Sequence, residues 1–200
     1  MQLELLAVER GVQLTVVPIR GNVDTRLSLV RTGQLDGTVL AAAGLRRLGR
    51  WAPDEGHAGS VSDLPATALG TDMMLPAAGQ GALAVECLDQ ADASLLAALT
   101  TLDDERTRAE VTCERTFLAT LEAGCLAPVG CLASSLSDDL DLDVIVDARL
   151  VGQHALLGEN SAIGTAHGVH RRRGSARLDS GADLGRRLAK DILREFGKEC

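Results

Sequence analysis

Two apolar runs decide the fold of this chain, Leu14-Thr15-Val16-Val17-Pro18-Ile19 and Thr38-Val39-Leu40-Ala41. Both are short and rich in β-branched residues, so each predicts a buried strand. Between them a helix is expected to begin after Asn22, a residue type favoured at helix N-termini, and to stop at Gly33. A helical turn is expected at residues 43–48. The order strand, helix, strand, helix predicts an α/β domain with parallel strands and a right-handed crossover.

The second half of the chain predicts a separate, small α+β domain with the order α-β-β-β-α. Asp103 or Asp104 is expected to cap its first helix. On that helix Cys113, Phe117 and Leu121 are four residues apart, so they share one buried face. The three strands and the closing helix are expected at residues 131–135, 142–151, 169–173 and 182–196.

The chain between these parts carries loop and linker signals. Residues 50–65 are rich in Gly, Pro, Ser and Asp, which predicts a surface loop. Residues 75–85 combine proline and glycine with an apolar run at 82–85, which predicts a crossing between domains and then a strand. A helix is expected at residues 95–102.

Composition excludes several classes of protein. The 200 residues are 46% hydrophobic and 24% charged, as in globular proteins rather than disordered chains. Aromatic residues make up 2% of the chain, which argues against a base-stacking surface. The net charge of -8 has the wrong sign for a nucleic-acid or anionic-membrane partner. With no long apolar run and no signal peptide, the sequence predicts a cytoplasmic protein.

Three arginines stand where ligands collect on a parallel sheet. Arg20 follows the first predicted strand, Arg26 lies in the next helix, and Arg47 follows the second strand. Arginine binds a carboxylate or phosphate through two parallel hydrogen bonds. The three arginines therefore predict a ligand with several carboxylate or phosphate groups. The alternative is that they are solvated surface arginines, in a chain whose composition favours arginine over lysine throughout.

Five cysteines lie at positions 87, 113, 125, 131 and 200, and no pair has the C-x-x-C spacing. Neither a disulfide framework nor a zinc site is indicated, and no other metal signature is present. Cys125 follows a predicted helix C-terminus, where the helix dipole opposes thiolate formation. It is therefore either a structural residue or a thiol that forms one permanent thioether. Cys87 and Cys113 are interpreted as packing residues, and Cys131 as part of the small sheet.

Basic residues also gather at Arg171-Arg172-Arg173, after His167 and His170. The run is either a patch for a polyanion or an exposed strand edge, and the acidic chain favours the edge. No Ser-His-Asp order or phosphate-binding loop is present.

Four ordered blocks resemble the porphobilinogen deaminases, also called hydroxymethylbilane synthases. The first block reads Ile19-Arg20-Gly21-Asn22-Val23-Asp24-Thr25-Arg26-Leu27. The last runs from Glu114-Arg115 through Leu121-Glu122-Ala123-Gly124-Cys125 to Pro128-Val129-Gly130. The other two blocks are residues 42–49 and 75–83. The resemblance spans nearly the whole chain and is weakest at residues 50–74 and 136–177.

The resemblance implies a fold of three α/β domains, two of them like periplasmic binding proteins. Residues 1–78 would be a partial second domain and residues 79–102 a return segment of the first. Residues 103–200 would be the C-terminal α+β domain that carries the cofactor cysteine.

The resemblance also implies a site and a reaction. Cys125 would carry a dipyrromethane cofactor through a thioether. Arg20, Arg26 and Arg47 would hold acetate and propionate groups of the cofactor and the growing chain. On this primer a monomeric enzyme would join four porphobilinogen molecules, with loss of ammonia, into hydroxymethylbilane.

The sequence departs from this family in its first residues. The family's catalytic aspartate lies in a first domain that would precede Met1, so no catalytic residue is expected within this chain. Residues 1–12 offer only Arg10 where paired arginines are usual, and Leu88 stands where relatives are commonly basic. Two other interpretations follow. The chain is either an incompetent, truncated remnant that at most binds polycarboxylates, or a product with no stable fold of its own.

Overall fold

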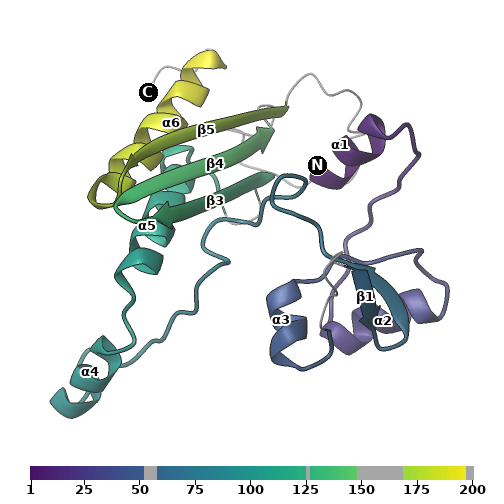
Figure 1. The fold of residues 1–200 in the computed structure, drawn as a ribbon, viewed down its shortest axis with the longest axis horizontal. Helices are drawn as coiled ribbons and strands as arrows, with labels where there is room; N and C mark the ends of the chain where they lie inside the picture. The colour runs from purple at the N-terminus through teal and green to yellow at the C-terminus, as the bar shows by residue number, and fades with distance from the viewer. Residues whose placement is uncertain (52–57, 125–126, 148–168, 197–200) are drawn as a thin grey trace. The chain divides into compact units, whose positions relative to one another are not determined.

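The computed structural model describes residues 1–51, 58–124, 127–147 and 169–196 (Figure 1). The chain divides into two compact units, residues 2–74 and residues 75–200, the second together with Met1. Each unit is a mixture of helices and a small antiparallel sheet. The two units are therefore described one at a time.

The unit of residues 2–74 contains three helices and one hairpin: α1 (Gln2–Glu9), α2 (Val23–Arg31), α3 (Ala42–Arg47), β1 (Ala58–Val61) and β2 (Leu64–Thr67). Helix α2 begins as predicted, because the Asn22 side chain accepts a hydrogen bond of 2.9 Å from the Thr25 amide. Gly33, at φ +71°, follows the end of the helix. The core of the unit is built from Leu27, Leu45, Trp51 and Val61.

The predicted parallel sheet is wrong for the described part of this unit. Residues 14–19 and 38–41 form no strand, and apolar side chains in both runs, Val16 and Val39 among them, are close to half exposed. A strand is stabilised by hydrogen bonds to a neighbouring strand, and neither run has such a neighbour among the residues described. The apolar run at 82–85 in the other unit is likewise not a strand.

The unit has a β-hairpin instead, and part of it lies within the predicted surface loop. Strands β1 and β2 pair from Ala58 opposite Thr67 to Val61 opposite Leu64. The two residues between the strands, Ser62 and Asp63, have φ of 50° and 68°. Positive φ at both positions is typical of two-residue hairpin turns, which usually contain Asn-Gly or Asp-Gly. This hairpin was missed because Ser-Asp lacks that signal.

The unit that begins at Leu75 confirms the predicted order α-β-β-β-α after residue 103. Its elements are α4 (Ala93–Thr100), α5 (Glu105–Thr120), β3 (Val129–Leu136), β4 (Asp139–Asp147), β5 (Val169–Arg177), the short 3-10 helix η1 (Leu178–Ser180) and α6 (Gly181–Glu195). The strands form one antiparallel sheet in the order β3-β4-β5. Figure 1 shows α5 and α6 together on one face of this sheet.

The core of this unit lies between the two helices and the sheet. Cys113 and Phe117 of α5 and Leu121, the residue that caps the end of this helix, are fully buried, as their spacing predicts. Leu184, Leu188 and Ile192 of α6 and alternate residues of β4 complete the core. Asp104 caps α5 by accepting a hydrogen bond of 2.8 Å from the Thr107 amide. No helix in the part of the chain that the structure describes is long and apolar enough to cross a membrane.

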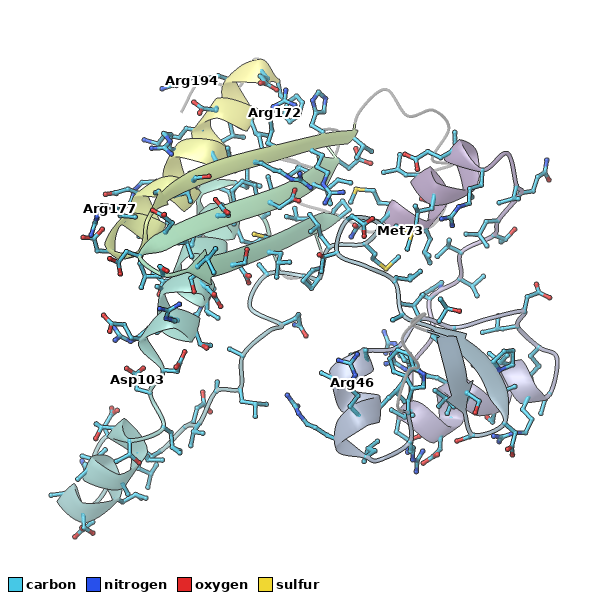
Figure 2. All side chains as sticks on the ribbon, viewed as in Figure 1. Arg46, Met73, Asp103, Arg172, Arg177 and Arg194 are labelled. Atoms are coloured by element: carbon cyan, nitrogen blue, oxygen red, sulfur yellow. The ribbon has the colours of Figure 1, made fainter. Side chains whose placement is uncertain are left out.

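The arginine run on β5 is an exposed strand edge, as predicted, since β5 pairs with β4 alone among the described strands. Arg171 and Arg173 both donate to Asp143 on β4, at 2.7 and 2.8 Å. Burial acts to raise the pKa of Asp143, but the two guanidinium groups outweigh it and lower that pKa. Arg172, labelled in Figure 2, donates to Glu195 of α6 at 2.7 Å. These pairs fix β5 to its neighbours in one register.

Candidate functional site

The three arginines singled out by the sequence all lie in the unit of residues 2–74. Arg20 and Arg26 flank the N-terminus of α2, and Arg47 is the last residue of α3. The two helices share a core through Leu27 and Leu45. The sheet edge on which the trio was expected to meet is not formed, so their joint use remains a proposal.

Arg20 and Arg47 are exposed and pair with no carboxylate in the described ranges. Arg26 differs, because its Nε donates to the Gly21 carbonyl oxygen at 3.0 Å. Four N–H donors of that guanidinium remain after this bond. The N-terminus of α2 lies between Arg20 and Arg26, and its free N–H groups also favour an anion.

Other arginines near these helices already have partners within the unit. Arg31 donates to the Ser62 carbonyl oxygen at 3.0 Å, and Arg50 pairs with Asp24. The guanidinium of Arg46, labelled in Figure 2, lies over the Trp51 ring, 5.5 Å from the ring centroid. Arg20 and Arg47 thus differ from these three arginines. Arg20 and Arg47 can bind a ligand, whereas the contacts of the other three stabilise the fold.

Cys125, the proposed cofactor attachment site, lies outside the described residues, but both sides of its loop are described. Helix α5 ends in a Schellman motif, in which the Ala123 amide donates to the Leu118 carbonyl and the Glu122 amide to that of Ala119. Glu122 has φ +52°, a conformation usually taken by glycine at this position. The Ala127 amide then donates to the Gly124 carbonyl at 2.9 Å.

The described ends of this loop are consistent with a covalently held group. Gly124 is exposed, and strand β3 begins at Val129, so only a few residues separate the helix from the strand. Such a short connection limits where a group attached within it can go. The described residues on both sides of Cys125 are therefore compatible with a group attached there, and the exposed guanidinium groups of Arg20 and Arg47 suit carboxylates.

The other described cysteines divide into two kinds. Cys113 and Cys131 are fully buried, which confirms Cys113 as a packing residue, and Cys131 lies on β3, which confirms it as part of the small sheet. Burial raises the pKa of the Cys113 thiol to about 12 and raises that of Cys131 as well. Cys87 is exposed, so its interpretation as a packing residue is wrong. The run before it, residues 82–85, forms no strand that could bury it.

Sequence reasoning gave no role to Glu114 of α5, one of the two acids that are buried among the described residues. Its side chain is 5% exposed, and its two oxygens accept hydrogen bonds from the Gly79 amide at 2.6 Å and the Ala133 amide at 2.8 Å. Burial raises the pKa of Glu114, while the two amide hydrogen bonds act to lower it. The available signal was the four-residue spacing of Glu110 and Glu114, which places both acids on one side of the helix.

Two family models match this chain. The model described as "Porphobilinogen deaminase, dipyromethane cofactor binding domain" matches residues 2–96, and the one described as "Porphobilinogen deaminase, C-terminal domain" matches residues 108–194. The chain belongs to the porphobilinogen deaminase family. The three arginines lie within the first match and Cys125 within the second.

Curated members of the porphobilinogen deaminase family align along most of the chain. Porphobilinogen deaminase 1 of Streptomyces avermitilis is 46% identical over 198 residues, which cover 96% of this chain and 54% of the relative. Porphobilinogen deaminase 1 of Streptomyces coelicolor is 57% identical over 137 residues, 68% of this chain and 39% of the relative. Porphobilinogen deaminase of Nocardia farcinica is 43% identical over 192 residues, 94% and 49% respectively. The chain thus spans about half the length of these relatives.

Proposed function

We propose that this chain is the cofactor-carrying part of a hydroxymethylbilane synthase, the transferase that joins four porphobilinogen molecules in tetrapyrrole biosynthesis. One observation carries the proposal. The family's cofactor-binding model matches residues 2–96, and in that range Arg20 and Arg47 are exposed with no carboxylate partner among the described residues. The dipyrromethane cofactor, when bound, supplies the pyrrole to which the first substrate is joined.

Each residue of the proposed site has a separate task. Cys125 holds the cofactor through a thioether, which needs a thiol in a defined loop rather than a lowered pKa. Arg20 and Arg47 bind the acetate and propionate groups of the cofactor and the growing chain. Arg26 adds its free N–H groups from a guanidinium that Gly21 holds in place. No catalytic residue is proposed within residues 1–200, since the resemblance puts the catalytic carboxylate elsewhere.

The arrangement of the chain follows from the same proposal. Residues 1–78 belong to the second domain, residues 79–102 return to the first domain, and residues 103–200 form the third. The protein acts on porphobilinogen as a monomer in the cytoplasm, without a nucleic-acid or membrane partner. Its net charge of -8 supports the last two points, because like charges repel both kinds of anionic partner.

The test uses a hybrid enzyme, in which residues 1–200 replace the stretch they match in the Streptomyces avermitilis relative. We expect the hybrid to consume porphobilinogen, to give uroporphyrin after oxidation, and to carry one dipyrromethane on the peptide that contains Cys125. Cys125→Ser should lose both the adduct and turnover. Cys87→Ser is the matched control, because Cys87 is an exposed cysteine of the same unit.

Two outcomes would contradict the proposal. An adduct mapped to another cysteine would show that Cys125 is not the attachment site. A hybrid that binds polycarboxylates but neither carries the adduct nor consumes porphobilinogen would favour the alternative of an incompetent remnant.

A further inference from the structure

Strand β3 is an edge strand of its sheet, so one row of its backbone groups faces away from β4. In an antiparallel pair these outward groups belong to alternate residues, here Cys131, Ala133 and Ser135. Unpaired amides at a sheet edge are costly when buried and invite pairing with another strand when exposed. The partners of these three amides therefore show what closes this edge.

None of the three partners belongs to a strand. The Cys131 amide donates to the Pro76 carbonyl oxygen at 2.8 Å. The Ala133 amide donates to Glu114 at 2.8 Å, and the Ser135 amide donates to Glu110 at 2.8 Å. Two acids one helical turn apart on α5, together with the segment that contains Pro76, thus complete the edge.

Glu114 alone makes a second connection. Its other oxygen accepts from the Gly79 amide at 2.6 Å, so one buried carboxylate joins α5, β3 and the segment of residues 75–81. Glu110 uses a single oxygen for both of its contacts, the amide and the hydroxyl of Ser135. Among the described residues no cation pairs with Glu114. Its charge is balanced by backbone amides, which ties the segment to the strand directly.

We propose that Glu114 is a positioning residue that latches residues 75–81 onto the edge of β3. Residues 75–81 directly follow the unit that contains Arg20 and Arg47, and β3 begins four residues after Cys125. The latch therefore fixes where the arginine-bearing chain enters the unit that carries the cofactor cysteine. Its effect on turnover rests on the function proposed above, whereas the contact itself does not.

The latch predicts a specific division of effects in the hybrid enzyme. Cofactor attachment depends on the loop between α5 and β3, whose ends are held by helix and strand independently of Gly79. Chain elongation needs the arginines as well, and residues 75–81 directly follow the unit that contains them. Loss of the latch should therefore lower kcat about tenfold and leave the adduct and the KM for porphobilinogen largely unchanged.

Glu114→Gln is the test and Glu110→Gln its matched control. A glutamine amide offers one acceptor oxygen, and its NH₂ group only donates, so at position 114 either the Gly79 or the Ala133 amide loses its partner. At position 110 one carboxylate oxygen already accepts both hydrogen bonds, so the single oxygen of a glutamine side chain can keep both. We expect hydrogen exchange at the Gly79 or Ala133 amide to be about tenfold faster in Glu114→Gln, and unchanged in Glu110→Gln.

Several results would overturn the latch. If hydrogen exchange at the Gly79 amide were unprotected in the unsubstituted protein, the latch would be refuted without any variant, even if Glu114→Gln fails to fold. The latch would also be refuted by equal exchange rates at the Gly79 and Ala133 amides, or by equal kcat values, in Glu114→Gln and Glu110→Gln. A hybrid with neither adduct nor turnover would refute the proposed function instead, and exchange at Gly79 would still decide whether the latch exists.

Discussion

At the residue scale, the arginines of residues 2–74 differ in what surrounds them rather than in their own chemistry. Arg31, Arg46 and Arg50 each contact a carbonyl, an aromatic ring or a carboxylate. Arg20 and Arg47 lie in solvent without a carboxylate among the described residues. An exposed charge adds little to stability, so a substitution there tests ligand binding with little risk to the fold.

Arg20→Leu or Arg47→Leu should therefore weaken elongation in the hybrid enzyme while its melting temperature stays nearly unchanged. Each lost charge-assisted contact to a carboxylate should cost about 1.5 to 3 kcal/mol, or roughly 10 to 100-fold in the rate of chain extension. Mass spectrometry of enzyme-bound intermediates measures this directly. Arg50→Leu is the control, because the Arg50 guanidinium already forms an ion pair with the Asp24 carboxylate. Equal effects of Arg20→Leu and Arg50→Leu would show that the site is misplaced.

The cysteines give a second prediction at this scale. The thiolate is the reactive form, and burial raises the pKa of Cys113 to about 12. At pH 8 the folded chain should therefore resist iodoacetamide at Cys113 and Cys131, and react at the exposed Cys87. Peptide mapping before and after addition of denaturant measures the difference. Rapid labelling of Cys131 in the folded chain would show that the small sheet does not bury it.

At the scale of elements, the contact between α5 and α6 depends on a glycine. A Cβ atom added at Gly185 of α6 would overlap the Cys113 carbonyl oxygen and lie 3.0 Å from the Phe117 nitrogen. Both are backbone atoms, which cannot rotate away as a side chain can. Gly185 thus allows the two helices to approach closely over the sheet.

Gly185→Ala should lower the free energy of unfolding by about 1 to 3 kcal/mol, even though alanine favours helix formation. Thermal denaturation followed by circular dichroism measures the loss. Gly81→Ala is the control, since a Cβ atom there meets nothing within 4 Å and the backbone is not left-handed. If Gly185→Ala were as stable as the unsubstituted chain, the close packing of the two helices would be wrong.

Elements with internal signals were predictable, and elements that depend on a distant partner were not. Helices α5 and α6 were predicted because apolar residues four apart, such as Cys113 and Phe117, must share a face whatever surrounds the helix. The run at 14–19 has the composition of a strand, but a strand also needs a neighbour, which one segment cannot specify. The candidate site divides in the same way. Arg20 and Cys125 were proposed from local motifs and stay predictions, whereas Glu114 acts through amides 35 and 19 residues away.

At the scale of the whole molecule, one stretch of chain exposes much apolar surface. Leu83 and Leu88 are 77% and 81% exposed, and α4 has no buried residue although six of its eight residues are leucine or alanine. Surface of this kind is typical of a segment that packs against another part of a protein. It fits the proposal that residues 79–102 return to a first domain.

The 200-residue chain expressed alone should therefore bind the dye ANS, associate at micromolar concentration and leave porphobilinogen unconsumed. In the hybrid enzyme the same residues should be covered, so ANS binding should fall and turnover should appear. Light scattering, ANS fluorescence and a porphobilinogen assay measure the three effects. Sustained turnover by the chain alone would show that it needs no further domain.

Because Trp51 is the single tryptophan of the chain, tryptophan fluorescence reports on the unit of residues 2–74. The chain has one tryptophan and no tyrosine, so its indole emission comes from the core beneath Arg46, in residues 2–74. The sheet and helices after Leu75 dominate the far-ultraviolet signal but are silent in fluorescence. A melt followed by both probes thus compares the unit of residues 2–74 with the chain as a whole. Carboxylates that bind at Arg47, next to Arg46 in sequence, should perturb the indole emission without any added label.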